Sequence, residues 1–198
     1  MNKGNWNIPN ALSLFRLLSV PALFYLSYTG NEHAFFILWL ISIATDALDG
    51  FLARTFHWQT RLGAILDSLA DTFIYIVTVI GIYFLKWDSF GSYKMQAILL
   101  LGFLLLPDIV ALLRFGKISS THLYTSKIGG LLQSFFVFYL FWKGFHPLLF
   151  QVVFWWTAMA FTENMIILLS ASSYPSNVKG LWWWWRRGKA EQDGEFLP

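Results

Sequence analysis

Four aspartates in an otherwise apolar part of the sequence are the residues best suited to chemistry. Asp46 and Asp49 are three positions apart, and Asp67 and Asp71 are four apart. Residues at these spacings share one face of a helix, so each pair presents two carboxylates side by side. The connection between the pairs is short, which predicts two antiparallel neighbouring helices. We therefore expect the four carboxylates to converge on one site.

Four converging carboxylates repel one another unless cations neutralise them. An ionised carboxylate within a membrane span costs a few kcal/mol or more unless it is paired or lines a wet cavity. Pairing with Arg54 and Arg61 is one way to neutralise them, and a cation path through a transporter is another. An all-oxygen ligand set suits Mg²⁺ or Mn²⁺ rather than Zn²⁺. Two such ions could activate a pyrophosphate and stabilise charge on both the attacking and the leaving oxygen.

Small residues beside the aspartates predict a groove for a ligand. Glycine inside a helix is less favourable than alanine by about 1 kcal/mol. Gly50 and Gly63 therefore indicate that something approaches the backbone closely. Together with Ala53 they could line a groove wide enough for a planar nucleotide base. Arg54, at the end of the first helix, could donate several hydrogen bonds to phosphate.

The composition places this site in a membrane protein. Of the 198 residues, 57% are hydrophobic and 13% are charged, whereas an ordinary soluble domain carries about 25% charged residues. The mean hydropathy is +0.53. The absence of cysteine excludes disulfides, thiolate nucleophiles and cysteine-based metal sites. The polar start of the sequence and the lack of a small-residue cleavage site argue against a cleavable signal peptide.

Six stretches are apolar and long enough to predict membrane-spanning helices. A helix needs about 20 residues to cross the hydrocarbon core. We therefore expect an all-α, polytopic membrane protein with a bundle of six transmembrane helices, at 11–28, 33–53, 62–85, 95–115, 127–142 and 147–170. These helices would form a single membrane domain over residues 1–189, beginning with a short N-terminal interfacial segment. A polar tail over residues 190–198 would follow.

The distribution of lysine and arginine orients the predicted bundle. With six spans, all of these residues except Lys86, Lys94 and Lys143 lie on or nearest one side of the membrane. An excess of positive charge marks the cytoplasmic side. The aspartates lie at the margin of that side, so we expect the site to face the cytoplasm. The WWWWRR stretch at 182–187 is expected to be an interfacial anchor.

The aspartate stretch matches the pattern D-x2-D-G-x2-A-R-x8-G-x3-D-x3-D, and the chain thereby resembles the CDP-alcohol phosphotransferase family. The eight fixed positions are occupied by Asp46, Asp49, Gly50, Ala53, Arg54, Gly63, Asp67 and Asp71. NIPNALSLFR at 7–16 is similar to the family opening P-N-x-L-(S/T)-x-x-R, with Pro9, Asn10, Leu12, Ser13 and Arg16. Six spans and the chain length also suit the family, so the resemblance covers essentially the whole chain.

The resemblance implies a reaction and a role for each residue of the pattern. Members transfer a substituted phosphate from a CDP-linked donor, usually CDP-diacylglycerol, to an alcohol and release CMP. It implies that two Mg²⁺ or Mn²⁺ ions are held by Asp46, Asp49, Asp67 and Asp71. Asp71 would also be the general base, and CDP would be bound by Asp46, Gly50, Ala53, Arg54 and Gly63. Members often form homodimers. No nucleic acid partner is expected, and a bacterial inner membrane is the expected location.

A basic segment suggests the acceptor alcohol. Residues 107–133 contain Arg114, Lys117, His122 and Lys127, which suit an acceptor that carries phosphate, such as glycerol 3-phosphate. The DIVALLR stretch followed by Lys127 and Gln133 resembles phosphatidylglycerophosphate synthases. We therefore take glycerol 3-phosphate as the best candidate acceptor, with Arg114 and Lys127 as its binding residues. Alternatively, these cations only mark the cytoplasmic side.

Other functions remain open at this point. The same chemistry could use phosphatidylglycerol, inositol phosphate or serine as acceptor, or a CDP-choline or CDP-ethanolamine donor with diacylglycerol. A cation transporter could use the aspartates as its conducting site, and a non-catalytic assembly protein would need no such chemistry. Metal-dependent release of CMP from CDP-diacylglycerol separates the enzyme from the transporter.

Overall fold

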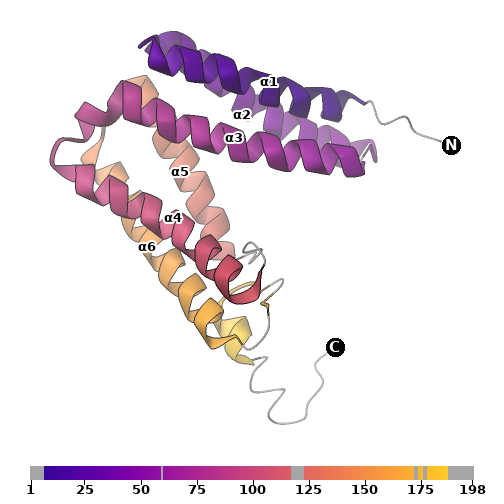
Figure 1. Ribbon diagram of the computed structural model, residues 1–198, viewed down its shortest axis with the longest axis vertical. Coiled ribbons are helices and arrows are strands. Elements are labelled where there is room, and N and C mark those ends of the chain that lie inside the picture. The colour runs from indigo at the N-terminus through magenta and orange to yellow at the C-terminus, as the bar shows by residue number, and fades with distance from the viewer. Residues whose placement is uncertain (1–6, 59, 117–122, 172–173, 176–177, 187–198) are drawn as a thin grey trace. The chain divides into compact units, whose positions relative to one another are not determined.

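The regular elements of the protein are helices throughout the residues that the structure describes. This computed structural model describes residues 7–58, 60–116, 123–171, 174–175 and 178–186. The elements are α1 (Ile8–Tyr28), α2 (Glu32–Thr55), α3 (Arg61–Lys86), a 3₁₀ segment η1 (Trp87–Tyr93), α4 (Lys94–Phe115), α5 (Tyr124–Lys143) and α6 (Pro147–Ser170) (Figure 1). Each of the six predicted segments lies within one of these α-helices, which confirms the helix positions. The predicted interfacial segment before residue 7 and the tail over 190–198 lie outside the described residues.

The helices fall into two compact units, residues 1–89 and 90–198. The first unit contains α1, α2 and α3, and the second contains α4, α5 and α6. A single membrane domain over residues 1–189 stays a prediction.

Side-chain caps begin the three helices of the first unit. The Asn7 side chain accepts a hydrogen bond from the backbone N–H of Asn10 at the start of α1. Asn31 caps α2, and Thr60 caps α3 by accepting from the N–H of Gly63 at 2.9 Å. These caps satisfy backbone donors that have no partner within the helix. The first turn of α1 also contacts the cap residue of α3, because the Asn10 amide donates to the Thr60 hydroxyl at 3.1 Å.

The buried face of α1 is mostly small or polar, and most of its large apolar side chains lie outside. The buried face of α1 consists of Pro9, Asn10, Ser13, Arg16, Ser19, Leu23 and Ser27. Its outward residues include Leu18, Phe24 and Tyr25, which are exposed. Small residues let helix backbones approach closely where lipid, not water, surrounds the helices. This arrangement therefore fits helices that lie in a bilayer.

Close helix contacts fix α2 against α3 in the first unit. A Cβ atom added to Gly81 would lie 2.2 Å from the Phe35 ring, so only glycine leaves room for that ring. Near this contact, the Trp39 indole N–H donates to the Thr78 hydroxyl at 2.9 Å. Ser19 of α1 and Ser42 of α2 are joined by a hydroxyl–hydroxyl bond of 3.1 Å. Because these bonds are buried, they satisfy polar groups that lipid could not.

Polar side chains also join the helices of the second unit. The Gln151 amide of α6 donates to Gln96 of α4 at 2.8 Å. The Gln133 amide of α5 donates to the Thr157 hydroxyl of α6 at 3.1 Å. Four phenylalanines pack together near the start of α6: Phe90, Phe136, Phe145 and Phe150.

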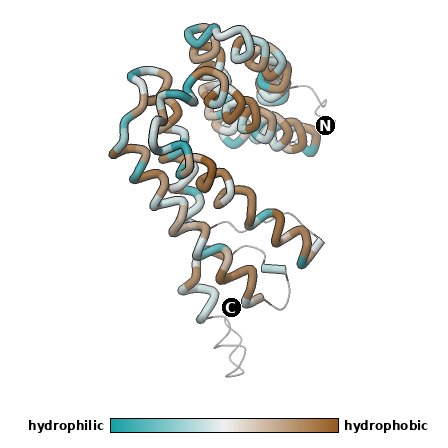
Figure 2. Tube along the Cα trace, turned by 60° about the vertical axis from the view of Figure 1, so that its left-hand side comes forward, coloured by the Kyte–Doolittle hydropathy of each residue, from teal (hydrophilic) through white to brown (hydrophobic). Residues whose placement is uncertain are grey.

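Within the part of the chain that the structure describes, four helical stretches are long and apolar enough to cross a membrane. They are α1, α2, the stretch Arg61–Phe115 and α6. The third stretch contains both α3 and α4, and α5 falls outside the set. Figure 2 shows how much of the helical chain is hydrophobic. The helices indicate a membrane protein, and a count of six spans stays a prediction.

Candidate active site

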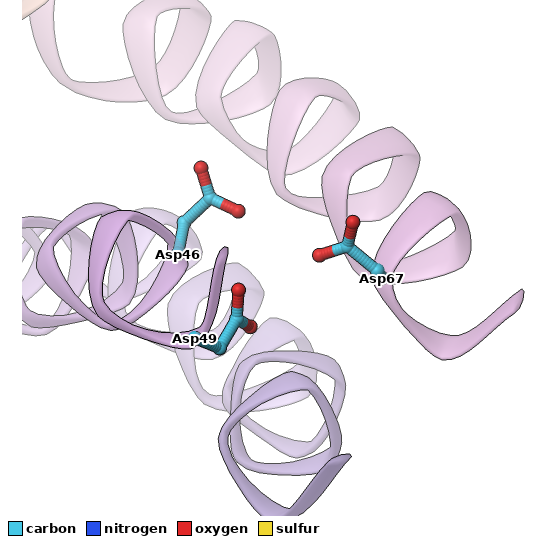
Figure 3. Close-up of side chains that lie close together, drawn as sticks. All are labelled: Asp46, Asp49 and Asp67. Atoms are coloured by element: carbon cyan, nitrogen blue, oxygen red, sulfur yellow. The ribbon is translucent and has the colours of Figure 1, made fainter. Parts of the chain in front are cut away.

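The carboxylates of three of the four aspartates converge between α2 and α3. Asp46 and Asp49 extend from α2, and Asp67 extends from α3 (Figure 3). Each offers an oxygen atom, and these three atoms lie within 4.8 Å of one another. This separation suits oxygens that share one cation. The predicted convergence of these side chains is confirmed, and their role as metal ligands stays a prediction.

Arg16 of α1 lies among all four carboxylates. Its Nη1 atom is 2.5 Å from Asp46 and 2.6 Å from Asp71, and its Nη2 atom is 2.7 Å from Asp49 and 2.5 Å from Asp67. The Arg16 residue is 1% exposed. The two terminal nitrogens of one planar guanidinium thus connect all three helices of the first unit. The ammonium group of lysine has one nitrogen and could not contact four carboxylates in this way.

Arg16 as a partner of the aspartates is a finding that the sequence analysis missed. From the sequence, Arg54 and Arg61 are the candidate partners, and Arg16 belongs only to the resemblance to the family opening. No ion pair of Arg54 or Arg61 is present among the described residues. The three-residue spacing of Ser13 and Arg16 indicates that they share one face of α1, and the structure shows that this face is buried. The Ser13 hydroxyl donates to Asp49 at 3.0 Å.

The charge of the cluster fits divalent cations. One guanidinium against four carboxylates leaves three negative charges unbalanced when all four are ionised. Asp49 is buried, whereas the side chains of Asp46, Asp67 and Asp71 are about half-exposed and can be reached from outside. Carboxylate oxygens are the ligands that Mg²⁺ and Mn²⁺ prefer. The donor set and its charge therefore fit a divalent metal, as the sequence predicted.

Asp71 differs from the other three aspartates. Among the described residues, it does not belong to the group of Asp46, Asp49 and Asp67, whose oxygen atoms lie within 4.8 Å of one another. Its carboxylate contacts the same Arg16 nitrogen as Asp46 and is the most exposed of the four. A carboxylate that is held less tightly by metal accepts a proton more readily than one at the centre of the metal site. This position supports the predicted base role for Asp71, which stays a prediction.

A cavity of about 210 Å³ adjoins the aspartates within the first unit. Asp49 and Asp67 line it, so it opens directly onto the carboxylate cluster. It also contains four of the five residues predicted to bind CDP, namely Gly50, Ala53, Arg54 and Gly63. Asp46, the fifth, is not among its lining residues. The α1 residues Pro9, Asn10 and Ser13 complete one wall, a contribution that the sequence analysis did not assign.

The two glycines of the cavity leave room for different things. A Cβ atom on Gly63 would lie 2.3 Å from the Asn10 amide oxygen, so glycine is required there for α1 to pack. A Cβ atom on Gly50 would contact only the flexible Arg54 side chain, at 3.4 Å. Packing therefore accounts for Gly63. At Gly50, the missing side chain leaves open space beside the cavity.

The two residues predicted to bind the acceptor belong to the second unit. Arg114 donates from Nη1 to the backbone carbonyls of Leu168 and Leu169 at 2.8 and 2.7 Å. It thereby caps the C-terminal end of α6. The Lys127 ammonium lies 5.8 Å from the centre of the Tyr124 ring. Both assignments to the acceptor stay predictions, and Lys117 and His122 lie outside the described residues.

Comparison with known proteins supports the family suggested by the motif. Two similar proteins are both named CDP-diacylglycerol--glycerol-3-phosphate 3-phosphatidyltransferase. The one from Wigglesworthia glossinidia brevipalpis is 33% identical over 126 residues, which is 62% of each chain. The one from Escherichia coli K12 is 37% identical over 78 residues, 38% of this chain and 43% of the relative. The chain thus spans less than two thirds of the length of these relatives, and no solved structure matches it.

The family assignment itself does not depend on those partial matches. The family model described as CDP-alcohol phosphatidyltransferase matches residues 6–163, which is most of the chain. The matched region contains the whole aspartate cluster, Arg16 and the adjoining cavity. This chain therefore belongs to the CDP-alcohol phosphatidyltransferase family.

Proposed function

We propose that this chain is an enzyme of phospholipid synthesis that transfers a phosphatidyl group from CDP-diacylglycerol to glycerol 3-phosphate and releases CMP. The observation that carries the proposal is the opening of the aspartate cluster onto a cavity lined by Gly50 and Arg54. The family supplies the class of reaction. The names of the two relatives supply the donor and the acceptor.

Two divalent ions, Mg²⁺ or Mn²⁺, would be held by the four aspartates. The ligands would be Asp46, Asp49, Asp67 and Asp71, of which the first three already lie within reach of one cation. When bound, the ions would neutralise the diphosphate and stabilise negative charge on the attacking and leaving oxygens. Arg16 would keep the carboxylates close together while ions enter and leave, because it contacts all four.

The cavity would bind the cytidine diphosphate part of the donor. Gly50 has no side chain and Ala53 has only a methyl group, so both would let the ligand approach the backbone of α2. The Arg54 guanidinium could donate to phosphate oxygens with two parallel hydrogen bonds. Thr60 and Gly63 lie at the first turn of α3, where backbone N–H groups and the helix dipole favour an anion. This wall would orient the diphosphate toward Asp49 and Asp67.

Asp71 would act as the general base. The acceptor hydroxyl loses its proton to the Asp71 carboxylate as its oxygen forms a bond to the phosphorus that carries diacylglycerol. The bond from that phosphorus to the bridging oxygen breaks, and CMP leaves with the bridging oxygen. General base catalysis by a positioned side chain contributes about 10²–10⁴-fold to the rate. Asp71 suits the role because it lies at the edge of the cluster.

Arg114 and Lys127 would bind the phosphate of the acceptor. A guanidinium has five N–H donors, so donation to the carbonyls of Leu168 and Leu169 leaves donors for a phosphate. We further propose six spans, an active site on the cytoplasmic side of a bacterial inner membrane, and assembly as a homodimer. The asymmetric distribution of lysine and arginine supports this orientation.

A direct assay tests the proposal. Purified full-length protein in nanodiscs is incubated with CDP-diacylglycerol, Mn²⁺ or Mg²⁺ and one alcohol at a time, and the lipid product is identified by mass spectrometry. We expect CMP release only with metal, and a new phospholipid only with glycerol 3-phosphate. A phospholipid product formed only with serine or only with phosphatidylglycerol would mean that this alcohol, and not glycerol 3-phosphate, is the acceptor. Metal flux across vesicles without CMP release would favour a cation transporter instead.

A further inference from the structure

A short helical segment after α6 has one face packed against the second unit. This segment covers residues 181–186 (Figure 1, in yellow beside the end of α6). Val178, Leu181 and Trp184 pack against Leu123, the residue before α5, and against Ile167 in the last turn of α6. Val178, Leu123 and Ile167 are fully or almost fully buried. The segment therefore has a fixed position and does not hang free from α6.

Glu163 of α6 holds this segment in place through hydrogen bonds. Its Oε1 atom accepts from the backbone N–H of Leu181 at 2.8 Å, and its Oε2 atom accepts from the Thr125 hydroxyl at 2.5 Å. The Trp184 indole N–H donates to the Ser170 hydroxyl at 2.9 Å. A carboxylate near a membrane normally has a partner. Here it connects the segment to both α5 and α6.

The opposite face of the segment consists of exposed tryptophans. Trp182, Trp183 and Trp185, which we call the tryptophan face, are 55%, 43% and 63% exposed. Cations accompany them, because the Arg186 guanidinium carbon lies 4.0 Å from the centre of the Trp182 ring and the nearby Lys179 is exposed. The sequence from 174 to 187 contains no acidic residue.

We propose that the tryptophan face binds the boundary between headgroups and acyl chains of an anionic lipid leaflet. Indole rings are stable at that boundary, and lysine and arginine beside them are attracted to lipid phosphates. The segment follows α6, a candidate span, by only eleven residues and is fixed to its last turns, so it lies where the chain leaves the membrane. The net positive charge of the segment and of the nearby Lys179 favours an anionic lipid surface over a protein partner of ordinary composition.

The absence of cysteine from the chain makes the test direct. A single cysteine is introduced as Trp183→Cys or Trp185→Cys, and a nitroxide label is attached. The full-length protein is placed in nanodiscs of phosphatidylcholine, with or without phosphatidylglycerol. Collision rates of the label with oxygen and with a water-soluble nickel complex then give its depth. We expect more collisions with oxygen than with nickel, and a greater depth when phosphatidylglycerol is present.

The role of Glu163 is tested with two matched variants that carry the label at position 183. Glu163→Gln keeps an oxygen that can accept from the N–H of Leu181, so the depth should not change. Glu163→Leu removes the acceptor, so the label should become mobile and its nickel collisions should rise several-fold. The labelled protein that keeps Glu163 tests membrane binding by itself, even if Glu163→Leu fails to fold.

Three results would overturn the proposal. Nickel collisions exceeding oxygen collisions at both positions would mean that the tryptophan face lies in water. Equal depth in both lipid mixtures would remove the preference for anionic lipid. Dipolar broadening between labels would mean that a second copy of the chain, and not lipid, covers this face.

Discussion

Replacing Arg16 by methionine should destabilise the protein in the absence of metal. Methionine keeps the unbranched shape of the arginine stem but removes the charge. Asp49, the buried partner, would be left without its cation. Removing one partner of a buried ion pair costs about 3–5 kcal/mol. The other three pairs involve half-exposed carboxylates, and exposed pairs contribute about 0–1 kcal/mol each. We therefore expect a loss of about 3–5 kcal/mol, dominated by Asp49.

Metal should reverse much of this loss. Without the guanidinium, four carboxylates repel one another and the positions it occupied are free for ligand bonds to an ion. Metal should therefore bind Arg16→Met more tightly than the parent protein. A ligand at about 100 times its Kd stabilises the folded state by about 2.7 kcal/mol. The difference in unfolding free energy between variant and parent should thus shrink markedly when Mn²⁺ is added.

The measurement is denaturant unfolding in detergent micelles with EDTA or with saturating Mn²⁺, alongside a titration of Mn²⁺ binding. Arg61→Gln is the control, because Arg61 is an exposed arginine at the start of α3 and has no ion pair among the described residues. It should unfold like the parent protein in both conditions. An Arg16→Met variant as stable as the parent in EDTA would refute the reasoning. A deficit that metal leaves unchanged would assign the effect to packing.

Four further predictions concern the aspartates and the glycines. Asp67→Asn should lower metal affinity by at least about 100-fold, since even partners outside the ligand shell change it by about 10–100-fold; calorimetric titration measures this. Asp71→Asn should reduce turnover by about 10²–10⁴-fold while metal binding persists through Asp46, Asp49 and Asp67, and near-normal CMP release would remove its role as the base. Gly63→Ala should destabilise the fold because its Cβ meets Asn10 at 2.3 Å. Gly50→Ala should unfold normally yet bind CDP more weakly, as equilibrium dialysis with labelled CDP would show.

The helices could be predicted from the sequence because apolar length alone determines them. Loops rich in polar residues and glycine separate the apolar stretches, so each predicted segment falls within one helix. The starts of the first and fifth helices were the least accurate, since α1 begins at Ile8 and not at 11, and α5 begins at Tyr124 and not at 127. No side-chain cap marks the start of α5, because Leu123 precedes it.

The position of Arg16 could not be predicted from the aspartate motif alone. The motif fixes the spacing of residues within α2 and α3, whereas Arg16 belongs to α1 and precedes Asp46 by 30 residues. Its contact depends on how α1 packs, and that packing depends on Gly63 and Asn10. The convergence of the carboxylates was predictable because it needs only helical spacing and a short connection. The cation at their centre is a product of tertiary structure.

The link from Arg16 to α2 and α3 has a consequence for how the chain is made. During synthesis α1 would enter the membrane before α2 and α3, carrying a guanidinium whose counter-charges have not yet been translated. Asp46 and Asp49 follow with the second helix, and Asp67 and Asp71 only with the third. We expect the first helix to reach its final depth late, once the ribosome has released all three. The order of translation and the order of burial would then be different.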